Sequence, residues 1–110
     1  MDSQTAELIA LVGELATELE GYGERHWAAW LRKDIASIRA GEEAGLDHLL
    51  AAYGGMGSIS DLRLCPANGH PIADEHVGAV NASLCRRGMR VYELARALRR
   101  TAAATLPATA

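Results

Sequence analysis

The chain contains 110 residues, with a mass of 11.7 kDa and a formal net charge of −3. This length accommodates one domain with a single core, and a hydrophobic content of 49% is typical of a folded chain rather than a disordered one. The mild acidity argues against general nucleic-acid binding, which usually requires a strongly basic domain or face. No apolar run reaches the roughly 20 residues of a membrane-spanning helix, so the sequence predicts no membrane partner.

Charge is divided unevenly between the two halves of the chain. Residues 1–55 hold ten acidic and four basic side chains, whereas residues 56–110 hold four acidic and seven basic ones. The chain has two cysteines without a CxxC pair, and it starts with an acidic segment where a secretory signal would be basic. These features predict reduced thiols and a cytoplasmic protein.

Helical periodicity accounts for most of the chain and predicts a mostly α fold. Apolar side chains recur at spacings of three and four residues in four segments, at about 3–21, 24–40, 42–53 and 74–101. Asp2 or Ser3 can cap the first helix and Asp74 the last, and Gly21 and Gly23 follow the first. The apolar stripe of the first helix consists of Leu8, Leu11, Val12, Leu15, Ala16 and Leu19.

One charged residue, Asp34, falls inside the apolar stripe of the second helix. At 100° per residue it lies about 20° from Trp27, so its carboxylate should point toward the core together with Trp27 and Trp30. A buried carboxylate needs donors or a proton. Either Asp34 is a structural residue bonded to backbone N–H groups or to an indole N–H, or it braces the following glycine loop from beneath.

The third helix is followed by the most unusual stretch of the chain, Tyr53-Gly-Gly-Met-Gly-Ser58. Gly54 is placed to cap the helix, and the glycines allow a sharp change of direction. One interpretation is a compact corner in which Ser60 or Asp61 bonds the backbone, and the other is a recognition loop that displays Met56, Ser58 and Ser60. Phosphate binding is not favoured, because a helix precedes the glycines and no lysine follows them.

Beyond the loop, residues 62–65 and 70–73 could pair as a short β-hairpin around the Asn68-Gly69 turn. The same region contains the metal-ligand types, at Cys65, His70, Asp74, His76 and Cys85. Their spacing matches no standard zinc motif, so the sequence predicts neither a metal nor a cofactor. No local pattern selects a nucleophile with its base, and the protein is expected not to be an enzyme.

Trp30-Leu31, Ile35, Ile38, Gly41 and Leu49-Leu50 precede the loop, and Ser60-Asp61-Leu62 ends it. With the Tyr53-to-Ser58 stretch, these residues resemble a group of small uncharacterised bacterial domains that share a Gly-Gly-Met-Gly-Ser core. The resemblance covers about residues 26–98, and Ser60 replaces the commoner asparagine before the aspartate. Small, acidic, helical proteins of this kind look like immunity proteins, which neutralise a cognate bacterial toxin.

The expected architecture is therefore a compact four-helix domain over residues 1–102, with a flexible tail over 103–110. The expected function is a non-catalytic module that binds and neutralises a toxin protein, and the alternative is a regulatory domain that binds a small molecule or anion through residues 54–58. The residues expected to contact the partner are Tyr53, Met56, Ser58, Ser60, Asp61, Glu42, Glu43 and Asp47. Those expected to support the site are Asp34, Trp27, Trp30, Gly54, Gly55 and Gly57.

Overall fold

The computed structural model describes the backbone of residues 1–105 and the side chains of residues 1–102. It contains four α-helices: α1 (Ser3–Gly21), α2 (Arg25–Arg39), α3 (Glu43–Ala51) and α4 (Val77–Thr105). Three short 3₁₀ turns lie between α3 and α4, at Ile59–Asp61, Pro66–Asn68 and Asp74–His76. The predicted mostly α, four-helix architecture is confirmed.

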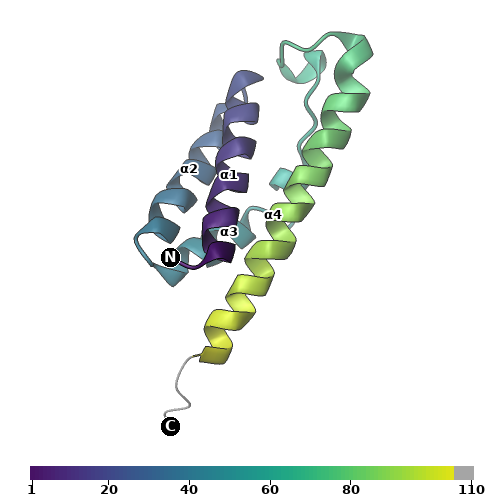
Figure 1. Ribbon diagram of the computed structural model, residues 1–110. Coiled ribbons are helices and arrows are strands. Elements are labelled where there is room, and N and C mark those ends of the chain that lie inside the picture. Colours follow the sequence, from purple (N-terminus) through teal and green to yellow (C-terminus); the bar gives the residue numbers. More distant parts are fainter. Residues whose placement is uncertain (106–110) are drawn as a thin grey trace.

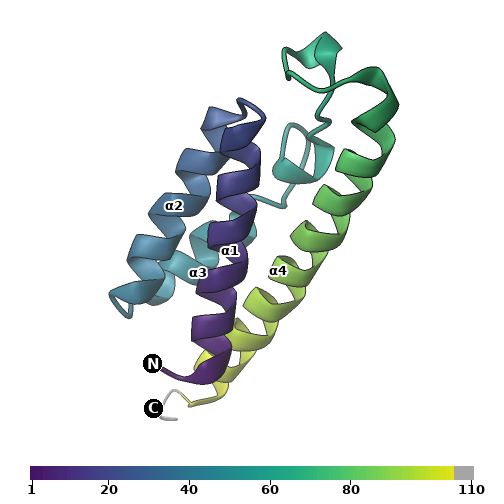
Figure 2. The ribbon, with the colours of Figure 1, turned by 45° about the horizontal axis from the view of Figure 1, so that its top comes forward.

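α1 and α2 lie side by side as a helical hairpin, and α4 runs along the opposite side of α1 (Figures 1 and 2). The Asp2 carboxylate caps α1 by accepting a hydrogen bond of 2.8 Å from the Thr5 backbone N–H. Gly23 has a φ of +79°, which lets the chain reverse direction between the end of α1 and the start of α2. Both features agree with the predicted helix boundaries.

The core is built around α1, which packs against both α2 and α4, while α3 closes it between these two helices. Its members are aliphatic, and the largest fully buried ones are Leu8, Val12, Leu15, Leu19, Leu31, Leu49, Leu64 and Val91. α4 has 29 residues and is therefore about 43 Å long, so its C-terminal end extends past the start of α1 (Figure 1). Among the described residues, no helix combines the length and apolar content needed to cross a membrane.

Glycine also sets the distance between α2 and α3. Gly45 is buried, and a Cβ atom at this position would lie 3.0 Å from both the backbone N and the Cγ1 of Ile38. Only glycine therefore fits this crossing without moving a backbone. The close crossing brings the side chains of α2 and α3 into direct contact.

The predicted β-hairpin is wrong, because residues 1–105 contain no strand and segments 62–65 and 70–73 do not pair. The side chain of Asn81 on α4 takes the place of a partner strand. Its Oδ1 accepts from the Leu64 N–H at 2.8 Å, and its Nδ2 donates to the Leu64 carbonyl at 2.7 Å. Nδ2 also donates to the Val77 carbonyl oxygen, with an N–O distance of 2.8 Å. The buried backbone of Leu64 is thus satisfied by one amide side chain.

The last helix begins at Val77 rather than at Asp74. Asp74 belongs to the 3₁₀ turn that precedes α4, and Ala73, which starts this turn, offers no side-chain cap. α4 continues to Thr105. Residues 106–110 lie outside the described residues, so the flexible tail predicted for 103–110 stays a prediction.

Candidate functional site

The glycine loop connects the end of α3 to the first 3₁₀ turn. α3 ends at Ala51 with Ala52 as its C-cap, and the loop residues with left-handed backbone conformation are Gly55 (φ +78°) and Gly57 (φ +76°). Gly54, which was expected to cap α3, does not have a positive φ. The reversal of the chain therefore occurs one residue later than the sequence suggests, and Met56 lies between the two left-handed glycines.

Three hydrogen bonds hold the loop in one shape. The Ile59 N–H donates to the Ala52 carbonyl at 2.8 Å, and the Gly57 N–H donates to the Asp61 carboxylate at 2.9 Å. The Ser60 N–H donates to the Ser58 hydroxyl at 3.2 Å. The Asp61 carboxylate thus occupies the position that an external anion would take at the Gly57 N–H. This contact does not favour an anion-binding site made of the loop N–H groups.

The loop displays only part of what the sequence suggests. Met56 is 99% exposed, and Ser60 also faces solvent, but Ser58 is buried with 6% of its surface accessible. Ser58 is therefore an internal cap rather than a displayed contact. Met56 stands at the tip of a loop whose backbone is fixed.

Tyr53 anchors the loop to the last helix. Its hydroxyl donates a hydrogen bond of 2.8 Å to the Gly88 carbonyl, and its ring lies 5.0 Å from that of Tyr92, measured between centroids. Burial raises the pKa of the Tyr53 hydroxyl well above its ordinary value. Tyr53 therefore acts here as a neutral donor within the fold rather than as a surface contact.

Of the acidic residues expected to face a partner, only Asp47 forms an ion pair with another described residue. Asp47 accepts a 2.7 Å hydrogen bond from Arg99 Nε, while Glu42 and Glu43 are exposed at the start of α3. On α1, two further carboxylates pair with α4: Glu7 with Arg90 at 2.7 Å and Glu18 with Arg87 at 3.1 Å. The acidic first half of the chain is thus folded against its basic second half, and Glu42 and Glu43 keep their charge exposed.

Asp34 is buried, as predicted, with only 1% of its surface accessible, but its partner is neither a backbone group nor an indole. Its Oδ1 contacts Nδ1 of His48 on α3, and its Oδ2 has no hydrogen-bond partner among the described residues. The His48 ring stacks on Trp30 at 4.1 Å between centroids, and the Trp30 indole N–H donates to the His48 carbonyl at 3.2 Å. Asp34 therefore joins α2 to α3 through His48 and has no hydrogen bond to the described residues of the glycine loop.

The stacked pair continues into a row of aromatic rings along α2. Trp30 lies 5.2 Å from Trp27, and Trp27 lies 4.8 Å from His26, both measured between centroids. Trp27 and Trp30 are half-buried, whereas His26 is exposed. Because Asp34 fixes His48 and His48 stacks on Trp30, the two tryptophans support the contact between α2 and α3.

The titration of Asp34 gives a testable pH dependence. Burial raises the pKa of this carboxyl above its ordinary value of 3.8, although the hydrogen bond and the charge of His48 oppose the shift. The folded state then holds the proton more tightly than the unfolded state. The resulting stabilisation is complete below about pH 4 and is lost as the pH rises through the folded pKa.

We therefore expect the unfolding free energy of the wild type, minus that of Asp34→Asn, to fall as the pH rises from about 4 and then to level off. Urea unfolding of both proteins at a series of pH values measures this difference. A difference that grows with pH would show that His48 outweighs burial and lowers the pKa.

His70 is buried, unlike the half-buried His48, and both of its ring nitrogens are engaged. Nδ1 accepts from the Cys65 N–H at 3.1 Å, and Nε2 lies 3.1 Å from the Glu24 carboxylate. The imidazole thus ties the turn after Cys65 to the start of α2. Among the described side chains, no three His, Cys, Asp or Glu residues are placed to hold a metal ion.

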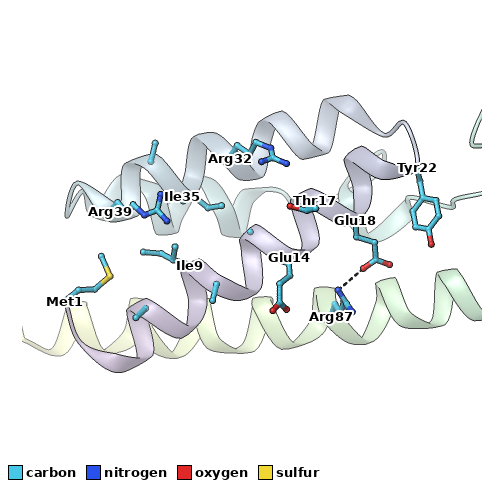
Figure 3. Close-up of a pocket in the computed structure, with 14 residues that line it drawn as sticks. Met1, Ile9, Glu14, Thr17, Glu18, Tyr22, Arg32, Ile35, Arg39 and Arg87 are labelled. Carbon is cyan, nitrogen blue, oxygen red and sulfur yellow. Dashed lines mark ion pairs between the residues drawn. The ribbon is translucent and has the colours of Figure 1, made fainter.

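A broad, open groove of about 1300 Å³ runs between α1 and α2 (Figure 3). Small residues of α1, among them Ala10 and Gly13, line it, with Arg32 and Arg39 on the α2 side. The ion pair of Glu18 with Arg87 of α4 lies at one end (Figure 3). Such an open surface suits contact with another protein better than enclosure of a small molecule.

Comparison with known proteins gives one match. The chain matches no curated protein and no solved structure. Residues 20–73 are similar to a family described as a domain of unknown function (DUF6966). The matched segment runs from the end of α1 through α2, α3 and the glycine loop, and it is just under half of the chain.

Proposed function

We propose that this protein is a non-catalytic binding module that neutralises a cognate bacterial toxin through its glycine loop. The observation that carries the proposal is the position of Met56. An apolar side chain 99% exposed at the tip of a fixed loop contributes nothing to the core. An exposed apolar side chain on a backbone that is already fixed is the kind of residue that becomes buried at the centre of a protein interface.

The hydrogen bonds of the loop support this role. The Asp61 carboxylate and the Ser58 hydroxyl hold the backbone, so little backbone freedom is lost when Met56 is bound. Glu42 and Glu43 lie at the other end of α3, whose nine residues span about 14 Å, and would attract a basic surface. Asp47 contributes less to this attraction, because Arg99 neutralises it.

The contacts of His48 support a role without catalysis. A histidine oriented by an aspartate is a common catalytic arrangement, but it also needs a nucleophile or substrate group within reach. Among the described side chains, no hydroxyl or thiol hydrogen-bonds to the His48 imidazole. We therefore assign the Asp34–His48 pair to stability.

The test is affinity purification of the tagged protein from its native strain, with mass spectrometry of the proteins that remain after a moderate-salt wash. The proposal predicts a stoichiometric basic partner that arrests growth when expressed alone and is harmless when this protein is co-expressed. No partner, or a partner that is harmless alone, would contradict it.

An Ala10→Arg variant distinguishes the loop from the α1–α2 groove. Ala10 is an exposed residue that lines the groove, and an arginine there would obstruct it without touching the loop. We expect Ala10→Arg to protect cells as well as the wild type does. Loss of protection by a folded Ala10→Arg protein would place the toxin contact in the groove instead.

A further inference from the structure

A second, smaller cavity of about 250 Å³ lies behind the glycine loop, between residues 59–63 and α4. It is more enclosed than the α1–α2 groove, and most of its lining is apolar. The apolar side chains that line it are Leu15, Ile59, Leu62, Leu84 and Met89. A cavity of this size, with an apolar interior, can accept one compact organic molecule.

The polar groups of the cavity divide into two kinds. The Tyr53 hydroxyl already donates to the Gly88 carbonyl, and the Asn81 amide already bonds the Leu64 backbone. In contrast, the Ser60 hydroxyl and the Arg63 guanidinium have no hydrogen bond or ion pair with any described residue. The free groups are thus donors, and one of them carries a full positive charge.

Charge in the cavity is therefore one-sided. Arg63 is the only charged residue among the described residues that line it. Its guanidinium offers a planar pair of N–H donors, the geometry that matches a carboxylate. The Ser60 hydroxyl can donate a further hydrogen bond to the same anion.

From this arrangement we propose that the cavity binds a small organic carboxylate with an aromatic or branched aliphatic body. The body lies among Leu62, Leu84 and Met89, and the carboxylate is bound by Arg63 and Ser60. This site is separate from the loop N–H groups, since Asp61 already occupies Gly57. It goes beyond the proposed toxin binding and does not depend on it.

The two cysteines provide a test within the native chain. Cys85 lines the cavity and is exposed, whereas Cys65 is half-buried and does not line it. The probes are 3-phenylpropionate and its neutral amide, which have the same body and differ in charge. Each is titrated against the folded protein while iodoacetamide alkylation of both cysteines is followed by mass spectrometry.

We expect 3-phenylpropionate to slow alkylation of Cys85 saturably, by about threefold or more, and to raise the thermal unfolding midpoint, with Cys65 unaffected. The amide should act only at concentrations about tenfold higher or more. Arg63→Met, which keeps an unbranched apolar stem and removes the guanidinium and its charge, should abolish the difference between the probes.

Three outcomes would overturn the proposal. The first is that neither readout responds to the carboxylate in the wild type. The second is that the two probes act equally, or that Arg63→Met leaves their difference intact. The third is a thermal shift without protection of Cys85, which would place the binding elsewhere on the protein.

Discussion

Replacement of His48 by alanine is expected to lower the free energy of unfolding by about 3 kcal/mol at neutral pH. The variant leaves the Asp34 carboxyl, which is 1% exposed, without its only side-chain partner. It also removes the ring that stacks on Trp30. Urea unfolding followed by far-ultraviolet circular dichroism measures the loss.

Two further variants separate these causes. Asp34→Asn keeps an acceptor for His48 without the buried charge, and we expect it to change stability by less than about 1 kcal/mol. Leucine is close to aspartate in size and branching and carries no polar atoms, so Asp34→Leu combined with His48→Ala should be more stable than His48→Ala alone. If the double variant is no more stable, the loss arises from the Trp30 stack and not from the unpaired carboxyl.

Replacement of Asn81 by alanine should have a comparable effect, a loss of about 3 kcal/mol. The change removes three hydrogen bonds and leaves the N–H and carbonyl of the buried Leu64 without partners. Unlike a surface substitution, it also removes the hydrogen bonds that attach the backbone at Leu64 to α4. Denaturant unfolding with an unchanged m-value would report this loss as one of stability alone.

Asn68 is the matched control for Asn81. It is also an asparagine that bonds a backbone carbonyl, that of Arg63 at 2.9 Å, but it is exposed and makes this single bond. We expect Asn68→Ala to cost less than about 1 kcal/mol. Equal losses at the two positions would contradict the role assigned to Asn81.

The helices were predictable because their signals are local. The Asp2 cap, the apolar stripe of α1 and the break at Gly23 are all read within one or two helical turns, and each is present in the structure. The same holds for the burial of Asp34, which follows from its angular position on α2. Periodicity and capping therefore give the fold class.

The contacts between distant segments were not predictable in this way. The Asp34 pair joins residues 14 positions apart, the Asn81 bonds join residues 17 apart, and the Arg90–Glu7 pair joins residues 83 apart. No local pattern marks Asn81 as a substitute for a strand, so the alternating segments after the loop suggest a hairpin. Likewise, the acidic first half of the sequence suggests an open charged face, because its arginine partners lie on α4.

The candidate site was partly predictable. The left-handed conformations of Gly55 and Gly57 follow from the residue type. The exposure of Met56, the burial of Ser58 and the hydrogen bond of Tyr53 to Gly88 depend on how the loop packs. His48 and Arg63 carry no sequence signal of a site, and Cys85 stands out only as a metal-ligand residue type. The pairing of His48 on α3 with the buried Asp34 on α2 becomes visible only when the two helices are placed together.

The most direct test of the central claim is toxin capture by variants of Met56. Because the side chain is almost fully exposed, Met56→Asp and Met56→Leu should both fold with wild-type stability to within about 0.5 kcal/mol. Capture from the native strain should be retained by Met56→Leu and should fall about tenfold or more in Met56→Asp, which would bury a charge in the interface. Equal capture of the toxin by wild type and Met56→Asp would contradict the assignment of the glycine loop as the binding site.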